Sequence, residues 1–216
     1  MPHVTRIVIA VINLKGGTGK TTTAAFIGHA LSERGLRVVY FDADKQASLQ
    51  AWGAAAEWAA PVIGKASSSL HRELDGIVGD RFDVVIIDTP PTEHDRGIAL
   101  SAARAATHCI VPVAPTPAEY QRMPALAELF ADATDLRPDG QPPEVAALLV
   151  RTVAGASSTD VYRRALTADG WPVLSSHVPR WERYAQALGE PVLNAGKTSY
   201  GHAVEQLLDL PMVVTA

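Results

Sequence analysis

The stretch Lys15-Gly16-Gly17-Thr18-Gly19-Lys20-Thr21-Thr22 decides how this chain is organised. It joins an apolar run typical of a strand to an amphipathic segment typical of a helix, which is the setting of a phosphate-binding loop. Its glycines let the backbone turn N–H groups inward, and the dipole of the following helix adds partial positive charge where phosphates would lie. Lys20 then supplies a point charge for the β- and γ-phosphates, and Thr21 a hydroxyl for Mg²⁺.

The loop carries a second lysine, Lys15, in the pattern K-G-G-x-G-K-[ST], while Leu14 stands where the usual G-x-x-x-x-G-K-[ST] pattern has its first glycine. This pattern resembles the deviant Walker A motif of the ParA/MinD family of ATPases. The resemblance implies that Lys15 reaches the phosphates bound by a partner subunit. A glycine-rich turn with two solvated lysines is the alternative, which the strand before and the helix after disfavour.

Length and composition indicate one globular domain over 1–216, because 216 residues at 47% hydrophobic content can bury a sizeable core. The formal net charge of -4 argues against coating nucleic acid by bulk charge but allows a local basic patch. One cysteine excludes an internal disulfide framework and a multi-cysteine metal site within one subunit. With no signal-peptide pattern and no apolar run long enough for a bilayer, we expect a soluble, cytoplasmic protein without a membrane partner.

Apolar runs alternate with amphipathic segments along the chain. We predict strands at 6–13, 37–42, 61–65, 82–87, 108–113, 145–150 and 172–178, and helices at 21–33, 48–60, 97–106, 118–132, 158–169 and 199–208, with a further helix after the serines at 67–69. Pro124 should interrupt its helix, and Pro90 and Pro91 disfavour a helix directly after the strand at 82–87. This alternation predicts an α/β fold with a doubly wound, mostly parallel sheet flanked by helices.

Two predicted strands end in carboxylates. Asp42 and Asp44 follow the strand at 37–42, and Asp88 ends the strand at 82–87 in the manner of a Walker B aspartate, which reaches Mg²⁺ through a water. The carboxyl ends of the strands form the edge where open α/β sheets bind ligands, so these acids should face the phosphate loop. A cap on the helix that follows is the alternative role for Asp44. The segment from Pro90 to Asp95 is a candidate sensor of the γ-phosphate.

The resemblance to the ParA/MinD family covers nearly the whole chain. It includes D-A-D-K-Q at 42–46, the strand-D-T-P-P at 84–91, and a tail from V-P-R at 178–180 to G-E-P-V at 189–192. It implies that Asp42 lies near the magnesium and that Asp44 orients the attacking water. Lys45 stands where the family usually has proline, which affects the stiffness of that segment.

Two further features have structural interpretations. Trp52 and Trp58 are six residues apart and therefore do not lie above one another on one helix face, so we expect them to pack in the interior instead of stacking on bases. Cys109 falls within a predicted buried strand, which favours a core role over a nucleophilic one.

The family resemblance implies a short ParA-type ATPase that partitions plasmids or chromosomes. ATP and Mg²⁺ would bind each subunit, and two subunits would close face to face into a homodimer. The partner would be a ParB-like centromere-binding protein, and the dimer would bind nonspecific DNA and associate with the nucleoid. The nucleotide contacts are expected at Lys15, Gly16, Gly17, Thr18, Gly19, Lys20, Thr21, Thr22, Pro115, Pro117 and Arg151; the metal contacts at Thr21, Asp42 and Asp88; catalysis at Lys15, Lys20 and Asp44; and DNA contacts at Arg163, Arg164, Arg180, Arg183 and Lys197. For each DNA-contact residue singly, a solvated surface position is the alternative, because acidic residues are interspersed through the same region.

Other functions of the same loop have sequence requirements of their own. A MinD-like membrane switch should end in a basic amphipathic helix, whereas the segment 209–216 carries no lysine or arginine. An iron–sulfur electron carrier of the nitrogenase type would need two cysteines per subunit. A metabolic ligase would need a second substrate site, and no further catalytic constellation stands out. A nucleotide-gated scaffold without hydrolysis is disfavoured by Asp44.

Overall fold

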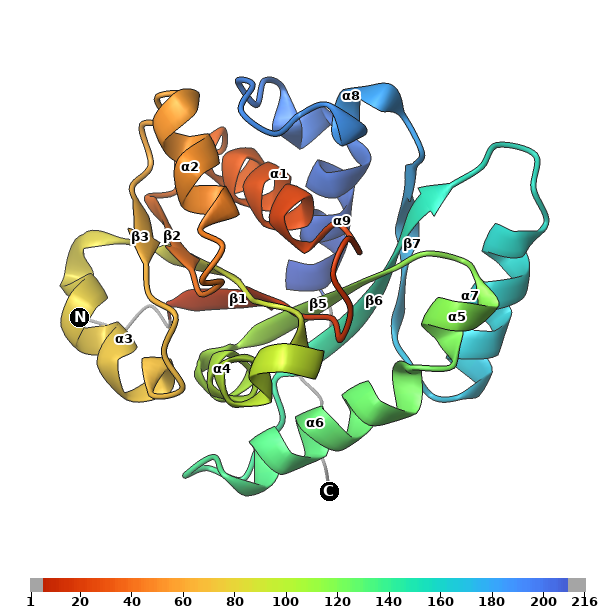
Figure 1. The fold of residues 1–216 in the computed structure, drawn as a ribbon, viewed down its shortest axis with the longest axis horizontal. Helices are drawn as coiled ribbons and strands as arrows, with labels where there is room; N and C mark the ends of the chain where they lie inside the picture. Colours follow the sequence, from red (N-terminus) through yellow and green to blue (C-terminus); the bar gives the residue numbers. More distant parts are fainter. Residues whose placement is uncertain (1–5, 210–216) are drawn as a thin grey trace.

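The computed structural model describes residues 6–209, apart from the side chains at positions 92 and 94. Its described residues form a seven-stranded, wholly parallel sheet in the order β3-β2-β4-β1-β5-β6-β7 (Figure 1). The strands are β1 Ile7–Val11, β2 Val38–Asp42, β3 Val62–Gly64, β4 Val84–Asp88, β5 His108–Val113, β6 Glu144–Thr152 and β7 Val173–Pro179. The predicted doubly wound α/β fold is therefore confirmed.

Helices connect these strands and cover the sheet on both sides. They are α1 Lys20–Ser32, α2 Ser48–Ala55, α3 Leu70–Val78, α4 Thr92–Ala105, α5 Pro117–Tyr120, α6 Met123–Asp135, α7 Ser158–Ala168, α8 Glu182–Ala185 and α9 Ser199–Leu208, with short 3₁₀ turns at Gly79–Arg81 and Ala195–Lys197. In the described part of the chain, no helix is both long enough and apolar enough to cross a bilayer.

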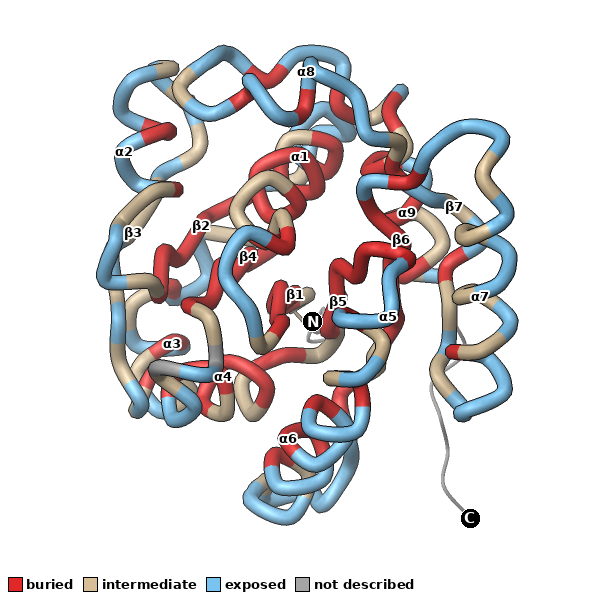
Figure 2. Tube along the Cα trace, turned by 45° about the vertical axis from the view of Figure 1, so that its right-hand side comes forward, coloured by how far each residue is buried: buried red, intermediate tan, exposed pale blue. Residues whose placement is uncertain are grey.

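The sheet separates two apolar clusters, because side chains of a strand alternate between its faces. Residues of α1, α2, α8 and α9 pack on one face, and residues of α3, α4, α6 and α7 pack on the other (Figure 1). The central strands β2 and β4 are buried along their whole length (Figure 2), as expected for strands covered by helices on both faces. This burial explains why their sequences are continuous apolar runs.

Two helices differ most from their predicted bounds. The helix predicted at 48–60 ends at Ala55, and Trp58 folds back so that its ring lies 5.4 Å from that of Trp52, which confirms the packing role of the pair. The helix predicted at 97–106 already begins at Thr92, directly after the prolines, with a non-helical kink at Asp95. Pro91 occupies the N-cap position, where the missing N–H of proline breaks no intrahelical hydrogen bond, so the prolines start this helix instead of delaying it.

Smaller features follow the expected chemistry. Pro124 lies in the first turn of a new helix, α6, so the predicted interruption is confirmed. Cys109 is fully buried in β5, and burial raises the pKa of its thiol, which confirms a core role. Ser69 is the N-cap residue of α3, but its hydroxyl makes no capping bond and instead contacts Glu73.

Candidate functional site

The phosphate loop connects β1 to α1 at the carboxyl edge of the sheet. Gly17 and Gly19 have φ values of 71° and 87°, a left-handed conformation that glycine adopts without steric cost. Gly19 is the N-cap of α1, and no side chain caps this helix or places negative charge in its first turn. The first N–H groups of α1 therefore keep the positive end of the helix dipole available to an anion.

Lys20 lies inside this loop. Its side chain is 7% exposed, and Nζ donates a hydrogen bond of 2.9 Å to the carbonyl oxygen of Lys15. The Thr18 hydroxyl reaches the same carbonyl at 3.4 Å. Burial lowers the pKa of Lys20, while the negative charges of Asp88, Asp44 and Glu119 raise it. Lys15 itself is exposed, so the two lysines differ in environment as well as position.

Two polar side chains anchor the loop to the neighbouring strands. Asn13 donates through Nδ2 to the carbonyl oxygen of Pro112 at 2.6 Å and accepts from the backbone N–H of Lys15 at 3.4 Å. Thr89 donates through Oγ1 to the carbonyl oxygen of Val11 at 2.7 Å. Both side chains are buried, so these bonds tie the loop to the ends of β4 and β5. Sequence reasoning missed both residues, because an Asn and a Thr next to strand ends carry no distinctive pattern.

Asp88 and Asp42 are register partners on the adjacent strands β4 and β2. Asp88 is fully buried, one of its carboxylate oxygens has no hydrogen-bond partner among the described residues, and the Thr21 side chain bonds to this carboxyl group. Burial raises the pKa of Asp88 to about 7, with the Thr21 bond and the Lys20 charge acting in the opposite direction. Asp88 is also the register partner of Val11, at the end of β1 that leads into the phosphate loop.

Asp42 has a different environment. Its Oδ1 accepts from the backbone N–H of Asp44 at 3.1 Å, and its Oδ2 accepts from that of Gln50 at 2.9 Å. Burial raises its pKa in spite of these bonds. Both oxygens already bind backbone, so the contacts of Asp42 hold the 44–50 segment and the start of α2 in place. This leaves the partnerless oxygen of Asp88 as the better placed metal ligand of the two.

Asp44 is half-buried just beyond β2. Its Oδ1 accepts a hydrogen bond of 2.9 Å from the backbone N–H of Gln46 within the turn. Its negative charge raises the pKa of both Lys20 and Asp88. The N-cap of α2 is Ala47, so Asp44 does not cap that helix. Lys45, in the next position, forms a salt bridge of 3.0 Å to Asp95 at the kink of α4.

The first turn of α4 lies against the phosphate loop. The backbone N–H of Glu93 donates to the carbonyl oxygen of Leu14 at 3.2 Å, and the Glu93 side chain pairs with Arg122 at 3.4 Å. Together with the Lys45–Asp95 pair, these contacts join the turn after β2, the start of α4 and the N-cap of α6. The predicted γ-phosphate sensor at 90–95 therefore contains the first turn of α4, which ends at the kink at Asp95, and its contacts include these two ion pairs.

The remaining nucleotide candidates lie at the ends of β5 and β6. Pro117 begins α5, and Pro115 lies in the turn before it. Arg151 is exposed near the end of β6 in a left-handed conformation with φ 56°, which is uncommon outside glycine and is often retained at functional sites. No hydrogen bond in the described structure joins any of these three side chains to the phosphate loop.

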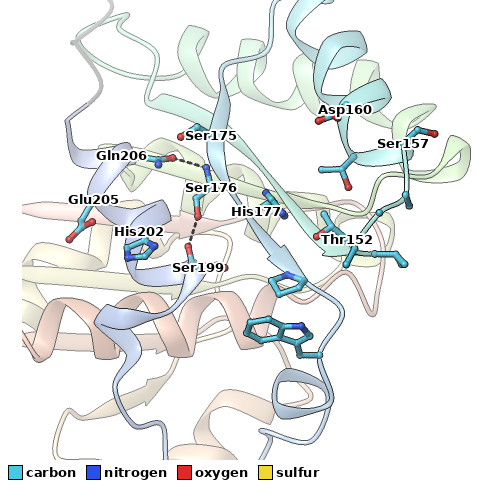
Figure 3. Close-up of a pocket in the computed structure, with 17 residues that line it drawn as sticks. Thr152, Ser157, Asp160, Ser175, Ser176, His177, Ser199, His202, Glu205 and Gln206 are labelled. Carbon is cyan, nitrogen blue, oxygen red and sulfur yellow. Dashed lines mark hydrogen bonds between the residues drawn. The ribbon is translucent and has the colours of Figure 1, made fainter.

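A cavity of about 960 Å³ runs along the outer edge of β7, between α7 and α9, and no phosphate-loop residue lines it (Figure 3). Hydrogen bonds from Ser176 to Gln206 and Ser199 cross it. One end reaches Thr152, Pro179 and Trp181, beside the position of Arg151.

The five arginines and lysines predicted to bind DNA have different surroundings. Arg163 donates from its guanidinium to the carbonyl oxygens of Leu174 and Ser175, where β7 bulges away from β6. This bonding satisfies backbone groups that the bulge leaves unpaired, so Arg163 has a role in the fold. The others are exposed and have no salt bridge among the described residues: Arg164, Arg180, Arg183 and Lys197.

The loop, the two strand-end aspartates and the fold around them match a known domain. The family model of the CobQ/CobB/MinD/ParA nucleotide binding domain matches residues 9–192 of this chain. This chain belongs to that family. The resemblance to ParA and MinD proteins expected from the loop is thereby confirmed.

Similar proteins have different cellular tasks. The maintenance of carboxysome distribution protein A of Halothiobacillus neapolitanus is 29% identical over 209 residues, 93% of this chain and 94% of that protein. The chromosome-partitioning ATPase Soj of Thermus thermophilus is 28% identical over 237 aligned positions, covering 93% of each. The cobyrinic acid a,c-diamide synthase of Mycobacterium smegmatis, solved with an ATP analogue and magnesium, matches with a TM-score of 0.69 at 26% identity over 86% of this chain and 91% of that one.

Family members use ATP together with Mg²⁺, and the residues of this chain fit the metal. The buried, partnerless oxygen of Asp88 and the hydroxyl of Thr21 are hard oxygen ligands beside the loop. Among residues 6–209 no cluster of three His, Cys, Asp or Glu side chains forms a cage for a metal ion. That suits Mg²⁺, which keeps several waters and takes few protein ligands when it is shared with phosphates.

The pKa of Asp88 predicts that Mg–ATP binding depends on pH. Because the metal prefers the ionised carboxylate and the raised pKa of Asp88 is about 7, affinity should fall by about tenfold between about pH 8 and about pH 6. Isothermal titration of the protein with Mg–ATP across this range measures the effect. Asp88→Asn should bind more weakly and retain only the pH dependence of ATP itself. An equal pH dependence in wild type and variant would contradict the assignment.

Proposed function

We propose that this protein is an ATPase that positions a DNA cargo, such as a plasmid or chromosome, through an ATP-bound homodimer on nonspecific DNA. The proposal rests on the phosphate loop with two lysines. Lys20 lies buried within the loop, where the negative charges of Asp44 and Asp88 raise its pKa. Lys15, at the start of the loop, is exposed. An exposed lysine next to a phosphate site is free to contact a second molecule.

In the proposed reaction the chain mainly positions groups. The N–H groups of the loop and Lys20 hold the phosphates, Thr21 and Asp88 hold Mg²⁺, and Asp44 orients water for in-line attack on the γ-phosphate. Mg²⁺ held by these residues would supply positive charge that offsets the charge of the phosphates. Lys20, and Lys15 from the opposite subunit, neutralise charge that develops on the transferred phosphoryl oxygens.

Turnover is expected to be slow until a partner completes the site. Asp44 sits on a turn that the exposed Lys45–Asp95 ion pair joins to α4, and surface ion pairs contribute little to rigidity. A ParB-like protein that fixes the segments after β2 and β4 would therefore accelerate hydrolysis.

Nonspecific DNA binding requires cations that are not neutralised within the protein. Arg164, Arg180, Arg183 and Lys197 meet this condition, whereas Arg163 is engaged with backbone carbonyls. The backbone N–H of Arg180 bonds to the carbonyl oxygen of Thr152, which brings Arg180 beside Arg151 at the ends of β6 and β7. A dimer would present two such surfaces and gain affinity by avidity.

A second function is favoured by one observation. The carboxysome-distribution relative matches 93% of this chain, so the cargo could be a protein compartment with the same ATP-dependent dimer on DNA. A metabolic synthase role is favoured less. The match to the synthase structure covers 86% of this chain and 91% of that one. The cavity along β7, however, lacks phosphate-loop residues that would present a γ-phosphate to a second substrate.

Sedimentation velocity tests the proposed function. Wild-type protein with Mg–ATP, but not with Mg–ADP, should form a dimer that co-sediments with a nonspecific DNA duplex at about 50 mM salt and loses it at about 200 mM salt. Replacing both Arg180 and Arg183 with Gln should weaken DNA binding without affecting dimerisation. The matched control is Arg72→Gln, which removes an exposed cation from α3. A protein that binds ATP but stays monomeric and ignores DNA would refute the proposal.

A further inference from the structure

Asp44 lies on a four-residue turn just beyond β2. The backbone N–H of Ala47 donates to the carbonyl oxygen of Asp44 at 3.0 Å, which closes residues 44–47 into this turn. Lys45 occupies the second position of the turn, where proline is favoured because its ring fixes φ. A lysine at this position leaves the backbone freer, so how firmly Asp44 is held depends on the other contacts of the turn.

Lys45 supplies such a contact with its side chain. Its Nζ donates to both carboxylate oxygens of Asp95, at 3.0 Å to Oδ1 and 3.3 Å to Oδ2. The Lys45 side chain is 65% exposed and that of Asp95 is 27% exposed, so water and salt reach the pair. Neither residue belongs to the two apolar clusters of the core. Both side chains can therefore be replaced without leaving a cavity in the core.

Asp95 lies where the course of α4 is interrupted. It has a non-helical backbone conformation inside that helix, with φ −139° and ψ 55°. Two residues earlier, the backbone N–H of Glu93 donates at 3.2 Å to the carbonyl oxygen of Leu14, directly before the phosphate loop. A continuous series of contacts thus leads from the phosphate loop through the first turn of α4 and the ion pair to the turn that carries Asp44.

The ion pair and a proline would affect the turn to a similar extent. Proline at a compatible turn position and an exposed ion pair each change an equilibrium constant by about two- to fivefold. The Lys45–Asp95 pair can therefore replace the stiffness that a lysine in the second position of the turn gives up. Because salt screens exposed charges, the pair holds the turn best at low ionic strength.

We propose, on the basis of the ATPase function above, that the Lys45–Asp95 ion pair positions Asp44 and sets the rate of hydrolysis before a partner binds. Both are positioning residues, since each acts through the turn and neither touches the reacting groups. The pair also connects the segment 90–95, the predicted γ-phosphate sensor, to the acid predicted to orient water. A partner that holds the turn directly takes over the role of the pair.

Amide hydrogen exchange in the nucleotide-free protein tests the positioning step alone. The N–H of Ala47 reports closure of the turn, because it donates to the Asp44 carbonyl. Lys45→Met and Asp95→Asn should each speed its exchange by about two- to fivefold, whereas Lys45→Arg, which keeps the cation, should not. Arg96→Met is the matched control, because it removes another exposed ion pair from the same helix.

A double-mutant cycle on ATP hydrolysis tests the coupling to Asp44. At saturating Mg–ATP and without partner, Lys45→Met and Asp95→Asn should each lower kcat by about two- to fivefold and leave KM unchanged. The double variant should be as slow as either single variant, because all three proteins lack the same contact. Lys45→Pro fixes the turn and removes an N–H that makes no hydrogen bond among the described residues, so Asp95→Asn should have no effect in this background.

Two results would overturn the inference. Unchanged exchange of the Ala47 N–H in both single variants would show that the pair does not hold the turn. Unchanged hydrolysis, or losses that multiply in the double variant, would show that the pair does not act on Asp44. A wild type that does not hydrolyse ATP would instead refute the proposed function and with it the role in hydrolysis, whereas the exchange result needs no nucleotide and is independent of that failure.

Discussion

Replacement of Lys15 with glutamine is expected to abolish ATP-dependent dimerisation while leaving the fold intact. The contacts of Lys15 within its own subunit are made by backbone atoms: its carbonyl accepts from Lys20 and Thr18, and its N–H donates to Asn13. The exposed ammonium is therefore available to the phosphates of a second subunit. Removing a buried, charge-paired group at an interface costs about 2 kcal/mol or more. The dimer contains the contact twice, so its dissociation constant should rise about 10³-fold.

Sedimentation equilibrium with Mg–ATP measures this change, and ATP binding by the monomer should remain within a few-fold of wild type. Arg72→Gln supplies the control, because it removes one positive charge at an exposed position of α3, remote from the loop in sequence. A Lys15→Gln protein that dimerises normally with ATP would show that Lys15 acts only within its own subunit or is merely solvated. The face-to-face arrangement would then lose its main support.

Replacement of Asp44 with alanine is expected to give a protein that binds ATP and dimerises but does not hydrolyse. Asp44 is half-buried, its charge raises the pKa of Lys20 and of Asp88, and its carboxylate accepts a hydrogen bond from the backbone N–H of Gln46 within its own turn. Loss of a group that orients or deprotonates the attacking water typically lowers the rate by 10²–10⁴-fold. We expect ATP turnover to fall by at least about 10²-fold, with DNA binding prolonged because the ATP-bound dimer persists.

Phosphate release measured under single-turnover conditions, with stimulating partner and without it, provides the readout. Asp44→Asn separates charge from local structure, because the amide oxygen can still accept the backbone N–H of Gln46. It should therefore preserve the turn and still lose hydrolysis. Full activity in Asp44→Asn would exclude a need for the carboxylate charge and leave water positioning to another group.

Predictions from the local sequence are correct where a segment determines its own conformation. The phosphate loop, the buried strands and the acids that end β2 and β4 could be predicted, because glycine spacing and apolar runs act over a few neighbouring residues. The start of α4 could not, since prolines are equally suited to ending one element and to starting a helix. Lys45 gave no indication of its partner, because Asp95 lies fifty positions away in the chain.

Tertiary structure alone decided which polar side chains share a site and which are engaged in hydrogen bonds to the backbone. Strand register places Asp88 beside Asp42, and among the described residues one Asp88 oxygen has no hydrogen-bond partner. The bulge in β7 engages Arg163, a residue that in sequence looked the same as its free neighbour Arg164. The physical reason is that hydrogen bonding and burial are collective: whether a side chain is free for a ligand depends on backbone groups brought to it by distant strands. The sequence by itself determined the phosphate loop and the sheet that carries it, because these depend on local backbone freedom and on apolar periodicity.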